Sequence, residues 1–185
     1  MKATPYMVEQ LIEKYGALQN AREVVCLIDY LQRIEQDGYA LSEPPSLFIE
    51  IGVWKGGNAA ILKTFFPDVR YIGVDVIAPE TATVAEFGLE IVQGESGPET
   101  VDRVRAMIGD RQADFLFIDA AHDYDSVKRD YQVWSPLAAR VGFHDVHNPM
   151  VYQFWQEVTG FMQPGPRTAA LWKEMDGHGI GVVYV

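Results

Sequence analysis

Residues 47–58, LFIEIGVWKGGN, decide the fold of this chain. Their first five positions form a short apolar run interrupted only by Glu50, which is typical of a strand buried on both faces. A turn with three glycines follows, and from Asn58 onward the apolar spacing becomes helical. A buried strand, a glycine-rich turn and a helix in this order form the first unit of a parallel α/β sheet.

The same alternation continues along the chain. Further strands are predicted at residues 70–75, 89–93, 114–119 and 140–144. The first forty residues are predicted to be helical, chiefly at 22–36, where Gly38 ends the helix. Further helices are predicted at 58–66, 100–108, 125–137 and 150–160. The last two predicted strands, 168–172 and 180–185, leave no room for a helix between them, so we expect them to pair antiparallel.

The length of 185 residues suits one domain, since domains usually hold about 100–200 residues. We therefore predict a single domain over residues 1–185, with an N-terminal helical extension (1–40) and an α/β core (47–185). The predicted parallel sheet is covered by helices on both faces.

Composition excludes several function classes. The 26 acidic residues outnumber the 15 basic ones, and the net charge of −11 disfavours nucleic acid and anionic membrane surfaces as partners. The longest apolar stretch, residues 114–121, is far shorter than the roughly 20 residues of a membrane helix. A single cysteine, Cys26, and a charged N-terminus without a signal peptide favour a cytoplasmic protein.

Ligands of such sheets bind beyond the carboxyl ends of the strands. The glycine turn after the first strand is not the G-x-G-x-x-G of dinucleotide sites, and Glu50 beside it favours a ligand with a cationic amino-acid part. Asp75 ends the second strand, where a carboxylate can accept both hydroxyls of a ribose. Gly94-Glu95-Ser96 follows the third strand and can flank a flat adenine ring, and Trp54 in the glycine turn can cover a ligand.

Three of the four histidines fall in the loops after the fourth and fifth strands. His122 follows Asp119, and His144 and His147 flank Asp145. Histidine with aspartate suits a divalent metal or general acid–base chemistry. Asp119 closes a very apolar strand, where an acid is costly unless it faces a polar site. The fourth histidine, His178, is predicted to be a turn residue.

Five motifs in order resemble the class I S-adenosylmethionine-dependent methyltransferases, and among these the small-molecule O-methyltransferase-like group. They are Phe48-Ile-Glu50-Ile-Gly52-x-x-x-Gly56, Asp75, Gly94-Glu95-Ser96, Phe117-Ile-Asp119-x-x-His122-x-Tyr124 and Phe143-His144-Asp145. The resemblance implies a three-layer, Rossmann-like α/β/α fold whose seven-stranded, mostly parallel sheet has an antiparallel C-terminal strand. It also implies methyl transfer to a small molecule, at a hydroxyl oxygen.

The resemblance further assigns a set of cofactor-binding residues. Glu50, Gly52 and Gly56 would lie along the methionine part of S-adenosylmethionine, and Asp119 beside its sulfonium. Asp75 would hold the ribose hydroxyls. The full set implied is Glu50, Gly52, Trp54, Gly56, Asn58, Asp75, Val76, Glu95, Ser96 and Asp119.

Some relatives in this family bind a divalent cation, and the corresponding positions here are Asp119, His144 and Asp145. A cation would hold the acceptor oxygen and lower its pKa. Histidine suits Zn²⁺, Mn²⁺ or Fe²⁺ better than Mg²⁺. The catalytic candidates are His122, His144 and Asp145, and without a metal His122 or His144 would be the general base.

Three alternatives remain open at this point. The chain could be a nicotinamide-dependent oxidoreductase, or a metal-dependent hydroxylase or hydrolase without a methyl donor. It could also be an inactive fold that binds the cofactor or a partner protein. Because no long lid insertion is present, the pocket is open, or is completed by the N-terminal helices or by a second subunit of a homodimer.

Overall fold

The computed structural model describes residues 1–32, 45–160, 169–172 and 177–185. The helices of this part are α1 (Pro5–Tyr15), α2 (Ala21–Gln32), α3 (Gly57–Phe65), α4 (Thr81–Phe87), α5 (Pro98–Ile108), α6 (Tyr124–Trp134) with the 3-10 turn η1 (Ser135–Leu137), and α7 (Pro149–Thr159). The strands are β1 (Leu47–Ile51), β2 (Arg70–Asp75), β3 (Glu90–Gln93), β4 (Phe115–Ile118), β5 (Arg140–His144), β6 (Ala169–Trp172) and β7 (Ile180–Tyr184).

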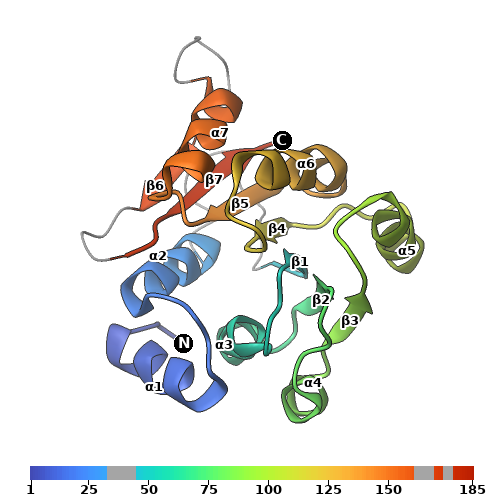
Figure 1. Cartoon of the computed structure of the whole chain (residues 1–185). Coiled ribbons are helices and arrows are strands. Elements are labelled where there is room, and N and C mark those ends of the chain that lie inside the picture. Colours follow the sequence, from blue (N-terminus) through green and yellow to red (C-terminus); the bar gives the residue numbers. More distant parts are fainter. Residues whose placement is uncertain (33–44, 161–168, 173–176) are drawn as a thin grey trace.

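Within the described ranges the strands form one seven-stranded sheet in the order β3-β2-β1-β4-β5-β7-β6 (Figure 1). Strands β1 to β5 pair in parallel, whereas β7 runs antiparallel to both β5 and β6. This arrangement confirms the predicted mostly parallel sheet with an antiparallel C-terminal strand, and the predicted antiparallel pairing of the last two strands.

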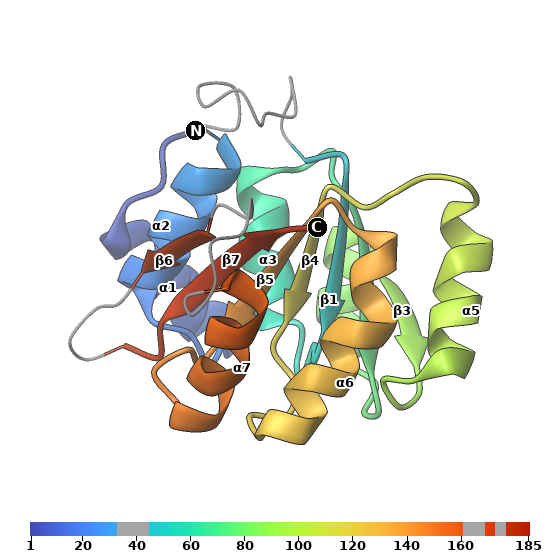
Figure 2. The ribbon, with the colours of Figure 1, turned by 90° about the horizontal axis from the view of Figure 1, so that it is seen from above.

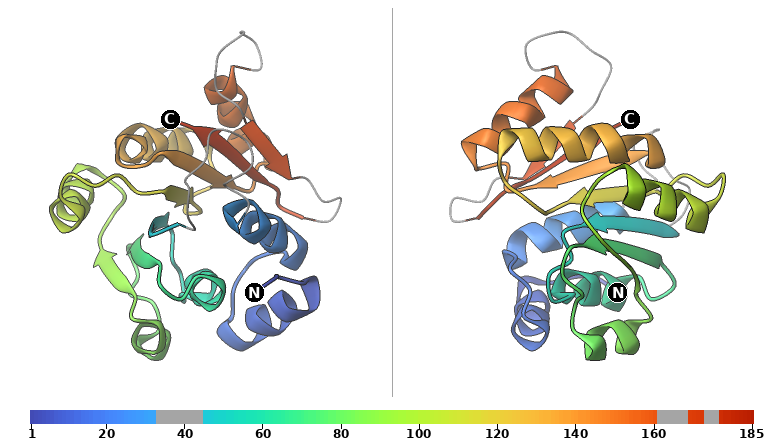
Figure 3. Two further views of the ribbon diagram at one scale, coloured as in Figure 1. Left: turned by 180° about the vertical axis from the view of Figure 1, so that it is seen from behind. Right: turned by 45° about the vertical axis from the view of Figure 1, so that its right-hand side comes forward.

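Helices cover both faces of the sheet, as Figures 2 and 3 show. Alternate residues of β1 enter different cores, because successive side chains of a strand point to opposite faces. Leu47, Ile49 and Ile51 pack with α5, α6 and α7, whereas Phe48 packs with α1, α2 and α3. The predicted three-layer fold is therefore confirmed.

The N-terminal prediction is only partly correct. Helices α1 and α2 are present, but the chain breaks between them because Gly16, with φ 67°, ends α1 in the left-handed conformation. The last part of the helix predicted at 22–36, its stop at Gly38, and Thr168 lie outside the described residues. Helix α4 was not predicted, since its seven residues are too few to show a helical period.

The sheet reverses its strand order between β1 and β4. The chain runs from β1 outward through β2 to β3, and β4 then returns to the other side of β1. Such a reversal opens a crevice at the carboxyl ends of the two strands, where α/β proteins bind their ligands. None of the described helices is long and apolar enough to cross a membrane.

Candidate active site

The glycine turn after β1 has a backbone that few other residues tolerate. Gly52 has φ 92° and Gly56 has φ 86°. A side chain at Gly52 would overlap the carbonyl oxygen of Asp119, because the ends of β1 and β4 lie directly side by side. Trp54 in the same turn also has a positive φ, 51°, and is 49% exposed. Such backbone strain is common at ligand sites.

Asp75 at the end of β2 holds this turn in place. Its Oδ2 accepts the backbone N–H groups of Val53 at 2.8 Å and Trp54 at 2.7 Å. Its Oδ1 accepts the N–H of Ile77 at 2.8 Å. A carboxylate that accepts several backbone N–H groups is rigidly oriented, so Asp75 faces the crevice in a fixed position.

Glu50 lies behind the turn and is buried, with 1% of its surface exposed. Asn58 Nδ2 donates to Glu50 Oε1 at 2.6 Å, and the Tyr71 hydroxyl donates a short hydrogen bond to Glu50 Oε2. Burial raises the pKa of Glu50 to about 8, although these two hydrogen bonds act against the shift. Its hydrogen bond to Asn58 therefore links Glu50 to the crevice, because Asn58 lines the cavity there.

Ser96, after β3, uses its hydroxyl inside the protein. It donates to Asp130 Oδ1 at 2.7 Å and accepts from Trp134 Nε1 at 2.7 Å. Burial raises the pKa of the Asp130 carboxyl. The sequence interpretation missed Asp130, although an acid on the apolar side of α6 is an unusual feature that could have drawn attention to it.

One cavity of about 1190 Å³ connects the ends of β1, β2 and β3 to the loops after β4 and β5. Its walls include most of the predicted site residues: Gly52, Trp54, Asn58, Asp75, Val76, Glu95, Ser96, Asp119, His122, His144 and Asp145. Glu50 and Gly56 are not on the walls, although Glu50 bonds the wall residue Asn58 and Gly56 precedes the wall residue Gly57. The loop between α1 and α2, from Gly16 to Asn20, also lines the cavity, so the N-terminal extension contributes to it through this loop.

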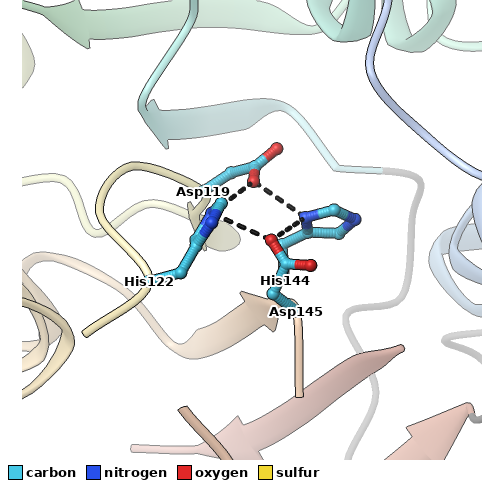
Figure 4. A group of neighbouring side chains, drawn as sticks. All are labelled: Asp119, His122, His144 and Asp145. Atoms are coloured by element: carbon cyan, nitrogen blue, oxygen red, sulfur yellow. Dashed lines mark hydrogen bonds and ion pairs between the residues drawn. The ribbon is translucent and has the colours of Figure 1, made fainter. Parts of the chain in front are cut away.

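Four side chains after β4 and β5 point toward one another (Figure 4). His144 Nδ1 lies 2.9 Å from Asp119 Oδ1 and 3.1 Å from Asp145 Oδ2. His122 Nε2 lies 2.9 Å from Asp145 Oδ2 and 3.6 Å from Asp119 Oδ1. One ligand atom from each residue lies within 4.8 Å of the others. We call these four residues the acid–histidine cluster.

The charges in this cluster shift the pKa of its members. Hydrogen bonds to Asp119 and Asp145 raise the pKa of His122 to about 9. Burial alone would lower the pKa of His144, but the two carboxylates outweigh burial and raise it to about 10. Burial likewise opposes ionisation of both carboxyls, yet the histidines hold the pKa of each below its usual range.

The donor set of the cluster fits a divalent cation. Two carboxylate oxygens and two imidazole nitrogens are ligands that Zn²⁺, Mn²⁺ or Fe²⁺ accept, whereas Mg²⁺ prefers oxygen. His144 is only 3% exposed, and its buried Nε2 has no hydrogen-bond partner among the residues that the structure describes. His122, which the predicted metal set of Asp119, His144 and Asp145 leaves out, supplies the fourth donor.

Two residues from distant parts of the chain extend the cluster. Gln19 Nε2 donates to Asp119 Oδ2 at 2.6 Å, and His178 Nδ1 lies 2.5 Å from Asp145 Oδ1. The interpretation of His178 as a turn residue alone is wrong, because its ring reaches the cavity wall. No local sequence signal marks either residue, since only the folded topology brings them to the site.

Comparison with known proteins agrees with the family resemblance that the sequence motifs carry. A sequence profile of the family described as "Methyltransferase domain" matches residues 49–148. A sequence comparison with curated proteins gave no match.

Several solved structures share the fold at low identity. A putative caffeoyl-CoA O-methyltransferase from Staphylococcus aureus is 14% identical, with a TM-score of 0.67 over 98% of this chain and 92% of that one. CalS11, a TDP-rhamnose 3'-O-methyltransferase of calicheamicin biosynthesis, is 18% identical, with a TM-score of 0.60 over 95% and 86%. The methyltransferase PaMTH1 from Podospora anserina, bound to S-adenosylhomocysteine, is 14% identical, with a TM-score of 0.61 over 98% and 88%.

Proposed function

The chain belongs to the methyltransferase-domain family and is an S-adenosylmethionine-dependent methyltransferase, and from this premise we propose that it methylates a hydroxyl oxygen of a small molecule. The observation that carries the proposal is that one cavity reaches both groups of site residues. The cavity joins the carboxyl ends of β1, β2 and β3 to the acid–histidine cluster. A methyl donor at these strand ends and a methyl acceptor at the cluster can therefore meet inside one space.

The donor occupies the half of the cavity formed by β1, β2 and β3. In our proposal Asp75 accepts the ribose hydroxyls, while Glu95 and Ser96 border the adenine. The Ser96 hydroxyl is already bonded to Asp130 and Trp134, so its contact with the ring comes from the backbone. Glu50 acts on the methionine part through Asn58, whose side chain lines the cavity.

Asp119, His122, His144 and Asp145 would hold a divalent cation at the other half. When bound, the cation would hold the acceptor oxygen and lower its pKa, which is the chemistry that metal ions supply to hydroxyl nucleophiles. The observation that supports this role is the convergence of one donor atom from each of the four residues within 4.8 Å of the others.

The reaction itself places few covalent demands on the protein. The acceptor hydroxyl loses its proton to water in the open cavity, and its oxygen attacks the methyl carbon. The carbon–sulfur bond breaks with both electrons staying on sulfur, so S-adenosylhomocysteine leaves as a neutral thioether. The chain contributes mainly by holding the two reactants in line.

Binding of S-adenosylhomocysteine tests the donor half. We expect micromolar affinity by calorimetry, on the order of −8 kcal/mol. Asp75→Ala should remove most of this affinity, whereas Asp68→Ala, an exposed acid near the opposite end of β2, should not change it. Absence of binding to the unaltered protein would overturn the donor assignment.

Turnover on paired acceptors tests the acceptor half. The purified protein is incubated with S-adenosylmethionine, Mn²⁺ and pairs of small molecules that differ only in a hydroxyl or an amine. We expect a mass gain of one methylene on hydroxyl acceptors alone, lost on chelation. Transfer to amines alone would contradict the oxygen assignment, and full turnover with chelator would remove the cation from the proposal.

Three other expectations from the sequence remain predictions: a single-domain organisation, a cytoplasmic location and a homodimer. The presence of one cysteine in the sequence, Cys26, supports the second of these. The exposed surface of Leu18 at the cavity wall is compatible with the third, because a second copy could cover it.

A further inference from the structure

The carboxylates of Asp119 and Asp145 in the acid–histidine cluster are held in the same way. Each turns one oxygen toward the histidines, Oδ1 in Asp119 and Oδ2 in Asp145. The other oxygen of each contacts a residue outside the cluster. Asp119 Oδ2 accepts from Gln19, and Asp145 Oδ1 lies 2.5 Å from His178 Nδ1. The outer contacts therefore fix the rotation of each carboxylate, with one oxygen facing the cluster and the other facing away from it.

The backbone of His178 is fixed from two sides. On one side the Glu23 carboxylate of α2 accepts the N–H of His178 at 3.2 Å and the N–H of Gly179 at 2.6 Å. On the other side the carbonyl of His178 accepts the N–H of His147 at 2.8 Å. Glu23 is fully buried, and a buried carboxylate requires such hydrogen bonds.

We propose that His178 is a positioning residue that holds Asp145 with a single oxygen facing the proposed cation, and that Glu23 fixes His178 for this task. This inference rests on the proposed function, since it concerns the same cation site. Asp145 itself has a positive φ of 57°, so its side chain leaves the backbone in an unusual direction. A hydrogen bond to the outer oxygen keeps such a carboxylate from rotating away from the histidines.

Cobalt binding measures this positioning without any turnover. The full-length protein, stripped of metal, is titrated with Co²⁺, and the visible absorption of the bound ion gives the dissociation constant. We expect His178→Ala to weaken binding by about 10- to 100-fold, the usual effect of losing an outer partner of a metal ligand. His178→Asn should restore most of the affinity, because its amide carries a donor close to the position of Nδ1.

Glu23→Gln supplies a second, independent variant. It keeps the size of the side chain but leaves one of the two backbone N–H groups facing an amide NH2, which cannot accept a hydrogen bond. Because the other N–H keeps its acceptor, we expect a smaller loss of Co²⁺ affinity than in His178→Ala. His147→Ala is the matched control, because His147 contacts Gly177 in the same loop but not Asp145. Its Co²⁺ affinity should equal that of the unaltered protein.

The possible outcomes distinguish the role of His178 from the proposed cation site. Unchanged Co²⁺ affinity in His178→Ala would overturn the role of His178 and leave the cation site standing. An equal loss in His147→Ala, or no recovery in His178→Asn, would show that the loop and not the imidazole donor matters, and would also overturn it. Failure of the unaltered protein to bind Co²⁺ would overturn the cation site and this inference together.

Discussion

The two halves of the cavity are built by different means. In the donor half, formed by the ends of β1, β2 and β3, Asp75 bonds the backbone of Val53 and Trp54, 21 or 22 residues away, and Asn58 bonds Glu50, eight residues away. In the acid–histidine half, Gln19 reaches Asp119 across 100 residues, and Glu23 reaches Gly179 across 156. The donor half thus depends on local turns, whereas the acid–histidine half depends on the complete topology.

Gly52→Ala would break both halves at once and has the largest expected effect. Its added carbon would overlap the Asp119 carbonyl and would also be strained at φ 92°. We expect the free energy of unfolding to fall by about 3 kcal/mol or more, and binding of S-adenosylhomocysteine to be lost. Chemical denaturation and calorimetry measure the two effects.

Gly88→Ala is the control for that substitution. Gly88 also has a positive φ, 60°, but a side chain there meets no atom within 4 Å. Gly88→Ala should lower the free energy of unfolding by only about 1 kcal/mol, the ordinary penalty of a side chain in the left-handed region. Equal losses in both variants would mean that the contact between β1 and β4 is not the cause.

Asp145→Asn should impair the acid–histidine half of the cavity and leave the donor half intact. We expect its Co²⁺ affinity to fall by more than the factor of about 100 that bounds the effect of outer partners, because a direct ligand loses its charge. S-adenosylhomocysteine should bind it as well as before, since among the described residues the Asp145 side chain bonds histidines and no residue of the donor half. Asp75→Ala should show the reverse pattern. A joint loss of both ligands in either variant would contradict the division into two halves.

The pH dependence of the free energy of unfolding, compared between the unaltered protein and Glu50→Gln, tests the donor half. The pKa of Glu50 is raised from 4.5 to about 8 in the folded protein, so between these values the folded state holds one more proton than the unfolded chain. The stabilisation from this group is therefore complete below pH 4.5 and is lost as the pH rises toward 8.

Between pH 5.5 and 7.5 we expect the unaltered protein to lose about 2 kcal/mol of stability relative to Glu50→Gln. Urea denaturation of both proteins without ligands at several pH values measures this difference. A constant difference between the two proteins across that range would contradict the protonated, buried state of Glu50.

Ser96→Ala has the smallest expected effect. It leaves Asp130 and the Trp134 N–H without their shared partner, which should lower the free energy of unfolding by about 1 to 2 kcal/mol. Affinity for S-adenosylhomocysteine should change little, because the hydroxyl bonds the protein and not the proposed adenine. A large loss of affinity without loss of stability would assign the hydroxyl to the ligand instead.

The sequence predicted the parts of the molecule that follow local rules. Buried strands such as 47–51 and the glycine turn were predictable because apolar runs and glycines act within a few residues. Asp119, His122, His144 and Asp145 were also predictable, since parallel strands end at one edge of the sheet. Gln19, Glu23 and His178 were not, because no pattern within the chain tells how the N-terminal helices and the loop before β7 meet that edge.

A crystal structure with S-adenosylhomocysteine and Co²⁺, with data collected at the cobalt absorption edge, tests whether one cavity holds the methyl donor beside a cation. We expect one anomalous peak among Asp119, His122, His144 and Asp145, with the ligand ribose on Asp75 and its sulfur facing that peak. A ligand seated in this way without cobalt at the cluster, or cobalt bound with the ligand outside the cavity, would contradict this expectation.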